Sequence, residues 1–163
     1  MRIISGKLKG SVLYITKDKK TRPLKDIARE SIFNLLIHSK KISFELEKAN
    51  VLDLYSGTGS FGLECLSRQA QNVYFVEKDK NAIEILKKNI NKLKLKEKTK
   101  VFFNDVSDLV EKQNIFESPF DLIFCDPPFK NKNIEKLVEL IFTKNLLNKN
   151  GIVILHRNKN SQD

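Results

Sequence analysis

Two segments of the sequence combine residue types that could bind a small ligand and act on an amino group. In residues 51–66, an apolar run of strand length leads into Ser-Gly-Thr-Gly-Ser and then into apolar residues at helical spacing. The second segment is Asp126-Pro127-Pro128-Phe129, which follows another apolar run. The first predicts a strand, a ligand-cradling turn and a helix. The second predicts a rigid loop at the end of a strand.

The glycine turn is suited to binding but does not identify its ligand. Gly57 and Gly59 allow positive φ and a close approach of the backbone, and the following helix N-terminus can hold a negative group. Residues 57–62 also fit the dinucleotide fingerprint, with Glu77 near the position of its ribose-binding acid. The turn alone therefore leaves open a nicotinamide cofactor, S-adenosylmethionine, or a tight turn without a ligand.

The proline loop indicates chemistry on a planar amino group. Two prolines fix φ and remove two N–H donors, which leaves a stiff loop rich in acceptors. The Asp126 carboxylate and a proline carbonyl could accept the two N–H groups, and Phe129 could stack on the ring. Alone, this loop is better read as a rigid turn. Its position after the glycine turn, Glu77 and Asp105 favours an amino substrate.

This reading distinguishes between the possible cofactors. A nicotinamide dehydrogenase has no need of such a loop, and no Tyr-x-x-x-Lys pair or histidine acid is evident beside it. Methyl transfer from S-adenosylmethionine therefore fits better, with positioning and electrostatics doing most of the catalysis.

The elements that must position these residues alternate along the chain. Apolar runs predict five strands, at residues 51–55, 72–76, 100–103, 120–125 and 151–155. Helical spacing predicts helices between them, including one that begins after Asp79 and others at 106–110 and 133–142. This order predicts an α/β fold, a Rossmann-like, doubly wound and mostly parallel sheet.

The first 41 residues form a basic extension to this core. We expect two short strands, at 2–5 and 11–15, joined as a hairpin, and a helix over about 24–36. Arg22, Lys25 and Arg29 would share one face of that helix. Its apolar side is expected to contain Ile27, Ile32, Phe33, Leu35 and Leu36.

Acids at the strand ends have two possible uses. Glu77 can accept hydrogen bonds from both ribose hydroxyls of a cofactor. Asp79 is better explained as a helix N-cap. Asp105 could accept from an adenine amino group or cap a short helix, and these uses are compatible.

The charge distribution indicates a polyanionic partner. The net charge is +10 over 163 residues. Residues 1–41 contain 11 Lys and Arg against 3 Asp and Glu, whereas residues 42–163 contain 19 against 17. Such a concentrated patch attracts phosphate backbones. The simpler alternative is a solvated basic arm.

Length and composition predict the number of domains and the compartment of the protein. The length fits one compact domain, formed by the extension (1–41) and a cofactor-binding core (42–163). Cys65 and Cys125 lie within apolar segments, which indicates buried thiols in a reducing compartment. We expect a cytoplasmic monomer without a bound metal and without membrane contact, because no metal-ligand cluster, signal peptide or membrane-length apolar run is seen.

These motifs resemble those of a known family. The glycine turn after residues 51–55, Glu77, Asn104-Asp105 and Asp126-Pro127-Pro128-Phe129 resemble the ordered motifs of class I N-methyltransferases. Residues 2–6, 21–23 and 29–34 resemble one branch more narrowly, the bacterial enzymes that methylate the 2-amino group of guanine 966 in 16S ribosomal RNA. The match covers nearly the whole chain, and its amino-terminal motifs are the more specific.

The resemblance implies an S-adenosylmethionine-dependent rRNA guanine-N2 methyltransferase that acts on the small ribosomal subunit. It implies catalytic residues at Asp126, Pro127, Pro128 and Phe129, with the target base turned out of its stack. The methionine part would contact Gly57 and Gly59, the ribose Glu77, the adenine Asp105, and the amino end Asp53. The remaining cofactor contacts expected are Tyr55, Ser56, Thr58, Lys78 and Asn104, and the RNA contacts expected are Arg2, Lys7, Lys9, Arg22 and Arg29.

One departure and two alternatives accompany this reading. Relatives of this type continue into two more strands, which this sequence to Asp163 lacks, so we expect an exposed sheet edge and reduced stability. The same proline loop serves enzymes that methylate DNA adenine or protein glutamine, although these usually have Asn where Asp126 stands. A non-catalytic RNA-binding or ribosome-assembly protein with this fold is the other alternative.

Overall fold

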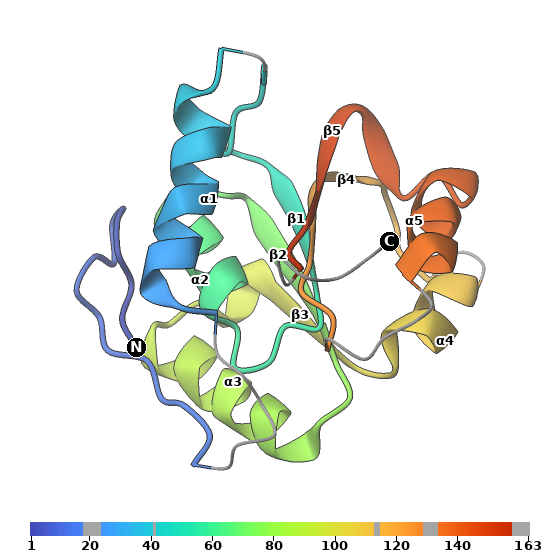
Figure 1. Cartoon of the computed structure of the whole chain (residues 1–163). Coiled ribbons are helices and arrows are strands. Elements are labelled where there is room, and N and C mark those ends of the chain that lie inside the picture. The colour runs from blue at the N-terminus through green and yellow to red at the C-terminus, as the bar shows by residue number, and fades with distance from the viewer. Residues whose placement is uncertain (18–23, 41, 113–114, 129–133, 158–163) are drawn as a thin grey trace.

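The computed structural model describes residues 1–17, 24–40, 42–112, 115–128 and 134–157. Its centre is a five-stranded sheet in the order β3-β2-β1-β4-β5, with every neighbouring pair parallel (Figure 1). The strands are β1 (Asn50–Leu54), β2 (Asn72–Glu77), β3 (Thr99–Phe103), β4 (Phe120–Cys125) and β5 (Leu147–Leu155). The predicted doubly wound parallel sheet is confirmed.

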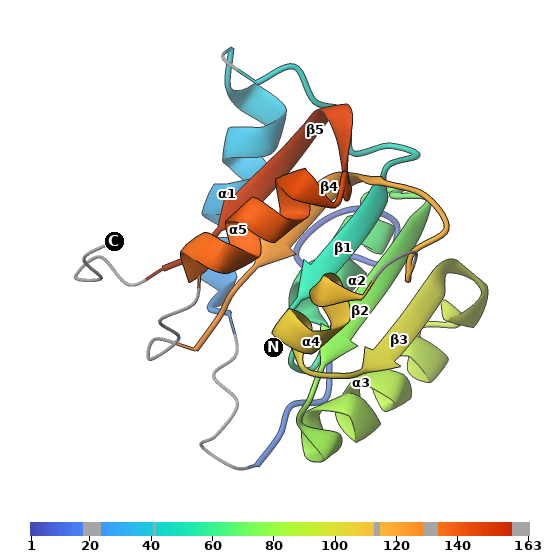
Figure 2. The ribbon, with the colours of Figure 1, turned by 90° about the vertical axis from the view of Figure 1, so that its right-hand side faces the viewer.

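Helices cover both faces of this sheet (Figure 2). The bounds are α1 (Asp26–His38), α2 (Ser60–Ser67), α3 (Lys80–Lys92), α4 (Val106–Glu111) and α5 (Ile134–Thr143), with a 3-10 turn at Lys96–Lys98. One hydrophobic cluster joins α1, α2 and α3 to the sheet, and a second joins α4 and α5 to its other face. Strands buried on both faces explain the nearly continuous apolar runs in the sequence.

The strands were predicted closely, and β5 differs most. β5 begins at Leu147, four residues before the expected start, and its register with β4 is irregular between Phe120 and Leu122. Residues 148–150, which are polar, therefore belong to the strand. The sequence did not predict this, because these residues have no apolar pattern typical of a strand. In the described part of the sheet, β5 is one edge and β3 the other.

The amino-terminal hairpin is less regular than predicted. Arg2 and Val12 form one antiparallel bridge, and Leu13 N–H donates to the Met1 carbonyl at 3.0 Å. Ile3 and Leu13 are buried in the same cluster as the sheet residues Val73 and Phe75. The extension therefore shares the core of the sheet.

Helix α1 begins two residues later than predicted, and its apolar side differs from expectation. Phe33 and Leu36 are buried as predicted, but Ile27 is 79% exposed and Leu35 is 62% exposed. The buried residues of α1 are Arg29, Phe33 and Leu36, which lie at positions i, i+4 and i+7 on one face of the helix. A charged residue thus occupies a position that we had assigned to the surface.

The described helices are also too short to cross a bilayer. The longest, α1 and α3, have 13 residues each, where a span needs about 20 apolar residues, and no described helix has the length and apolar character of such a span.

Candidate functional site

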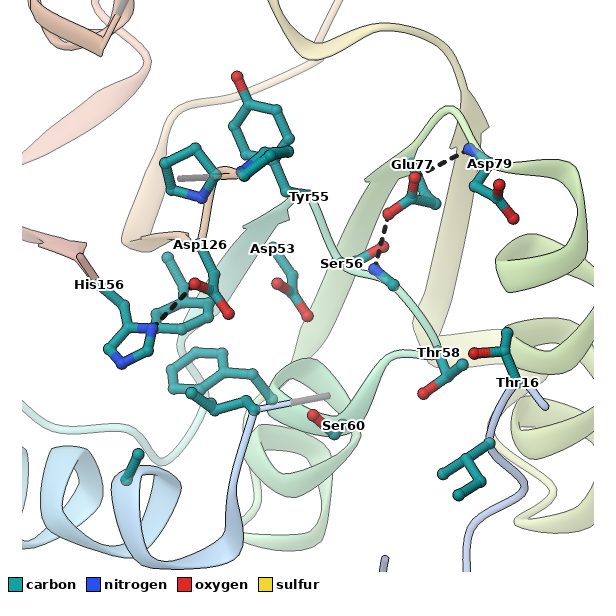
Figure 3. Close-up of a pocket in the computed structure, with 18 of the residues that line it drawn as sticks. Thr16, Asp53, Tyr55, Ser56, Thr58, Ser60, Glu77, Asp79, Asp126 and His156 are labelled. Carbon is teal, nitrogen blue, oxygen red and sulfur yellow. Dashed lines mark hydrogen bonds and ion pairs between the residues drawn. The ribbon is translucent and has the colours of Figure 1, made fainter. Parts of the chain in front are cut away.

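A cavity of about 480 Å³ opens at the carboxyl ends of the parallel strands (Figure 3). Asp53 near the end of β1, Glu77 at the end of β2 and Asp126 just after β4 line it together. Such a position is where open α/β sheets bind ligands, because the strand order reverses there and the connecting helices diverge. The parallel sheet therefore brings these three acids, which lie at or near the ends of three different strands, into one cavity.

The turn after β1 requires its glycines. Gly57 and Gly59 have φ of 54° and 86°, and a Cβ on Gly59 would lie 2.3 Å from Leu86 Cδ1. A Cβ on Gly62 would lie 2.4 Å from Phe75 Cε1. The first two glycines allow the turn, and Gly59 and Gly62 allow α2 to pack closely against α3 and β2.

The carboxylate of Asp53 accepts a hydrogen bond from the first turn of α2. Gly62 N–H donates to Asp53 Oδ2 at 3.0 Å, and Leu63 N–H donates to the Gly59 carbonyl at 2.9 Å. The Leu63 bond is the first i to i−4 bond of the helix, whereas Gly62 N–H has no partner within the helix and is paired with Asp53. Binding of a ligand anion at this helix end stays a prediction.

Burial changes the ionisation of Asp53. The residue is 1% exposed, and its carboxyl pKa is raised to about 8. Burial is the largest cause, the nearby carboxylates of Asp126 and Glu77 add to it, and the hydrogen bond from Gly62 N–H partly opposes it. A cation bound in the cavity would favour the ionised form of Asp53.

Glu77 connects the two loops that form the cavity wall. Its Oε2 accepts from Gly57 N–H at 2.8 Å, and its Oε1 accepts from Lys78 N–H and Asp79 N–H, each at 2.8 Å. A carboxylate has about four acceptor positions, so these three bonds leave capacity for a ligand hydroxyl. Asp79 caps α3 through Ala82 N–H at 2.9 Å, as predicted.

Lys78 and Asp105 form a partly exposed ion pair at one end of the site. Lys78 Nζ lies 2.8 Å from Asp105 Oδ2, and this hydrogen bond raises the pKa of Lys78 and lowers the pKa of Asp105. Asp105 Oδ1 caps α4 through Ser107 N–H at 2.9 Å, so the predicted capping role is confirmed. Lys78 lines the cavity, whereas Asn104 and Asp105 are outside its lining. Contact with an adenine stays a prediction.

Asp126, Pro127 and Pro128 follow the last residue of β4 and line the cavity. Both prolines line it, Pro127 buried and Pro128 exposed, and the described chain contains no cis peptide bond. Asp126 Oδ1 lies 2.8 Å from His156 Nδ1, across from the end of β5 (Figure 3). Phe129 lies outside the described residues, so its predicted stacking role is untested.

The other predicted cofactor contacts lie in the same place. Tyr55, Ser56 and Thr58 line the cavity beside Gly57. Tyr55 has a φ of 59°, a left-handed conformation that is uncommon for a residue with a side chain. The backbone therefore turns sharply from β1 into the loop.

Sequence reasoning missed several residues of the cavity wall. His156 follows the fifth strand as Asp126 follows the fourth, and this matching position was the signal that could have identified it. The extension also contributes to the wall, through Ile15, Thr16, Leu24, Lys25 and Ala28. No local pattern shows that a segment distant in sequence folds over the cavity.

The predicted RNA-contacting residues have different surroundings. Arg2, Lys7 and Lys9 are exposed on the amino-terminal extension. Arg22 lies outside the described residues. Arg29 is wholly buried, so its assignment to an RNA-facing surface is wrong.

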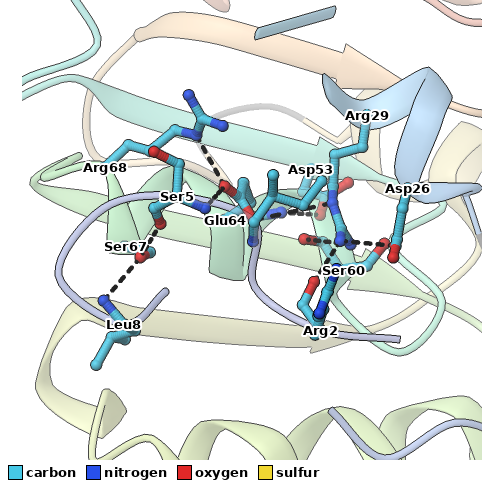
Figure 4. Close-up of polar contacts among 12 residues, drawn as sticks. Arg2, Ser5, Leu8, Asp26, Arg29, Asp53, Ser60, Glu64, Ser67 and Arg68 are labelled. Atoms are coloured by element: carbon cyan, nitrogen blue, oxygen red, sulfur yellow. Dashed lines mark hydrogen bonds and ion pairs between the residues drawn. The ribbon is translucent and has the colours of Figure 1, made fainter. Parts of the chain in front are cut away.

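Arg29 instead joins α1 to the first residues of the chain and to α2 (Figure 4). Its guanidinium donates to the Arg2 carbonyl and to Asp26 Oδ1, the latter at 2.9 Å. Its Nε lies 3.9 Å from Glu64 Oε2. Burial lowers the pKa of Arg29, and the charges of Glu64 and Asp26 oppose that effect.

Glu64 is the acceptor at the centre of this cluster. It is wholly buried and accepts from Ile4 N–H at 2.7 Å, from Ser5 N–H at 2.9 Å and from Arg68 Nε at 2.8 Å. We call Arg29, Glu64 and Arg68 the docking cluster, because they fasten the extension to α2.

Comparison with known proteins agrees with this architecture. All of residues 1–163 match the family described as Conserved hypothetical protein 95. The chain belongs to this family. Its parallel sheet, covered by helices on both faces, is the Rossmann-like fold of class I methyltransferases.

Individual relatives match over most of their length. "Putative rRNA methyltransferase YlbH" of Bacillus subtilis is 33% identical over 98% of this chain and 83% of its own. "Ribosomal RNA small subunit methyltransferase D" of Haemophilus influenzae is 33% identical over 98% of this chain and 79% of its own. The solved structure of "Putative methyltransferase yhhF from Escherichia coli" superposes with a TM-score of 0.82 at 28% identity, covering 100% of this chain and 84% of the other.

Within the part of the chain that the structure describes, no three or more His, Cys, Asp or Glu side chains come together so as to hold a metal ion.

Proposed function

We propose that this protein transfers a methyl group from S-adenosylmethionine to the exocyclic N2 of a guanine in 16S rRNA of the small ribosomal subunit. The observation that carries this proposal is the convergence of Asp126-Pro127-Pro128, Glu77 and Asp53 on one cavity. The names of the relatives, two of them rRNA methyltransferases, support RNA as the substrate class.

The residues of the cavity fit this cofactor. Asp53 is a buried acid beside the cavity, and the methionine ammonium that the cofactor carries would favour its ionised form. Glu77 has acceptor capacity for a ribose hydroxyl, and Lys78 and Asp105 lie beyond it toward the adenine end that we assign. When bound, the cofactor supplies an electrophilic methyl group on a sulfonium sulfur.

On the substrate side, the proline loop would orient the amino group. Asp126 accepts one amino N–H, and a carbonyl of the loop accepts the other, so that the nitrogen lone pair points toward the methyl carbon. Asp53 and Glu77 would hold the cofactor with its methyl group facing this nitrogen, and methyl transfer would leave the electron pair of the broken C–S bond on the sulfur of the cofactor. The nitrogen gives up one proton, with Asp126 as the nearby acceptor and solvent as its final destination.

The extension would guide the RNA. Its exposed Arg2, Lys7 and Lys9 offer charge to phosphates, and its residues Ile15 and Thr16 reach the cavity. A guanine inside a helix cannot reach Asp126, so the base must turn out of its stack or come from a single-stranded region. We further propose that the protein works as a monomer in the cytoplasm, with the core of residues 42–163 binding the cofactor.

The test is transfer of labelled methyl from S-adenosylmethionine to small ribosomal subunits from cells that lack this modification. Label in 16S rRNA at a guanine 2-amino group supports the proposal, and Asp126→Ala should lower the rate by roughly 100-fold or more. Asp108→Ala is the matched control, because Asp108 is an exposed aspartate on α4.

Other substrates separate the alternatives. Label in DNA or in bulk protein, but not in rRNA, would redirect the proposal to those substrates. Tight RNA binding without cofactor binding would indicate a non-catalytic protein.

A further inference from the structure

His156 and Asp126 end neighbouring strands side by side. Cys125 of β4 pairs with Leu155 of β5, so the next residues along each strand, Asp126 and His156, stand opposite each other. His156 N–H donates to the Cys125 carbonyl at 2.9 Å, which continues the ladder. The sheet therefore holds the backbone of His156 in place beside the catalytic loop.

Their side chains meet inside the cavity. The distance from His156 Nδ1 to Asp126 Oδ1 is 2.8 Å, with exposed side-chain fractions of 35% and 23%. An ionised carboxylate only accepts hydrogen bonds, so Nδ1 must carry the proton of this bond. In the neutral imidazole this leaves Nε2 without a proton.

The proline loop limits which neighbouring groups can donate to Asp126. An aspartate at a turn commonly accepts a hydrogen bond from the N–H of a residue that follows it. The next two residues, Pro127 and Pro128, have no N–H, so neither can donate to the carboxylate. His156, anchored on β5, does supply a hydrogen bond to it.

The acid Asp53, which lies near Asp126, makes the hydrogen bond from His156 more important. Asp53 is near enough that the Asp126 carboxylate raises its pKa, and Figure 3 shows Asp126 between His156 and Asp53. When a bound cation ionises Asp53, as we propose for the cofactor complex, the two like charges repel each other. The hydrogen bond from the histidine then helps to hold the Asp126 carboxylate in place.

We propose that His156 is a positioning residue for the methyl transfer: its Nδ1–H holds Asp126 Oδ1, so that Oδ2 of the same carboxylate meets the substrate amino group. The inference rests on the proposed function. Nothing is transferred to or from His156, and the amino proton still leaves by way of Asp126.

A matched pair of variants tests this role. Asn and Leu have nearly the same shape, but only Asn offers an N–H at the position of Nδ1. His156→Leu should lower kcat for transfer to small subunits by roughly 10- to 100-fold, with the KM for S-adenosylmethionine within about twofold of the wild-type value. His156→Asn should restore most of kcat. His38→Leu, at the exposed end of α1, is the control for removal of a histidine.

Spectroscopy of the imidazoles gives a second readout that does not depend on turnover. The chain contains two histidines, so a long-range ¹H–¹⁵N spectrum has two ring systems, and the spectrum of the His38→Leu variant assigns them. We expect the Nδ1–H form for His156 in the wild-type protein. The Asp126→Ala variant should lose that preference while its melting temperature stays within about 3 °C.

Each contrary outcome has a distinct meaning. If the wild-type protein transfers no methyl group to any RNA, the proposed function fails and this inference fails with it. If the wild type is active and His156→Leu is as active or more so, His156 does not position Asp126. A loss in His156→Leu that Asn does not restore, with a lower melting temperature in both variants, would show a structural role instead.

Discussion

Two buried acids, Glu64 on helix α2 and Asp53 on strand β1, illustrate different uses of burial. In the docking cluster, Glu64 is wholly buried but receives two backbone N–H groups and the cations Arg29 and Arg68. In the cavity, Asp53 is equally buried, and the hydrogen bond that it accepts from Gly62 N–H does not offset the cost of burial. The first acid is neutralised by the chain, whereas the second remains suited to a cation from outside.

This comparison distinguishes a buried acid that stabilises the fold from a buried acid that is suited to bind a ligand. Burying a charge is costly unless it is paired and hydrogen-bonded. Where the chain supplies the partners, the cluster fastens elements together; where it leaves an acid beside a cavity with a raised pKa, a ligand is the expected partner. Composition alone cannot distinguish the two, because both are acids beside apolar residues.

The largest effect is expected from breaking the docking cluster. Glu64→Ala leaves the buried guanidinium of Arg29 without its main countercharge, and the free energy of unfolding should fall by about 3–5 kcal/mol. Urea unfolding measures this, with the exposed Glu84→Ala of α3 as the control. A change below about 1 kcal/mol would mean that the cluster is replaceable.

A smaller effect, of a different kind, is expected from Asp53→Asn. The substitution removes the charge that we assign to the cofactor ammonium, so the affinity for S-adenosylhomocysteine should fall by roughly 10- to 30-fold. Calorimetry in two buffers of different ionisation enthalpy should also show proton release on binding at pH 7 in the wild-type protein but not in the variant. Equal affinities would contradict the assignment.

The pH dependence of stability sharpens the same contrast. The folded-state pKa of Asp53, about 8, lies above the ordinary value of 3.8, so the folded protein retains a proton that the unfolded chain releases. The contribution of Asp53 to stability should therefore decrease as the pH rises from about 4 to about 8, and stay constant above. Asp53→Asn should be the more stable form at pH 8.5, by roughly 1–3 kcal/mol. Parallel curves for the two proteins in urea unfolding from pH 5 to 9 would refute this.

The smallest effect is expected at the exposed end of the extension. Removing both Lys7 and Lys9 should weaken RNA binding by roughly 3- to 10-fold at low salt and reduce the log–log salt slope by about 1.4. Filter binding at several salt concentrations measures both. Replacing two exposed lysines of the core, Lys87 and Lys88 on α3, is the matched control. An equal loss in the control would mean that the protein binds RNA through general charge.

The sequence determined the sheet and the position of its acids. Strands buried on both faces have apolar runs that are visible without coordinates, and glycines and acids follow them at the points where the strands end. Because parallel strands share one carboxyl edge, Asp53, Glu77 and Asp126 had to meet there, and the structure brings them to one cavity.

Only the tertiary structure decided which charges are buried and what pairs with them. Arg29 looked like a surface cation because helical spacing gives a face but not its direction, and the burial of Phe33 and Leu36 turned it inward. The pairing of His156 with Asp126 and the reach of Ile15 and Thr16 to the cavity depend on contacts between segments far apart in the chain. Local propensity has no information on such contacts, since they follow from packing of the whole core.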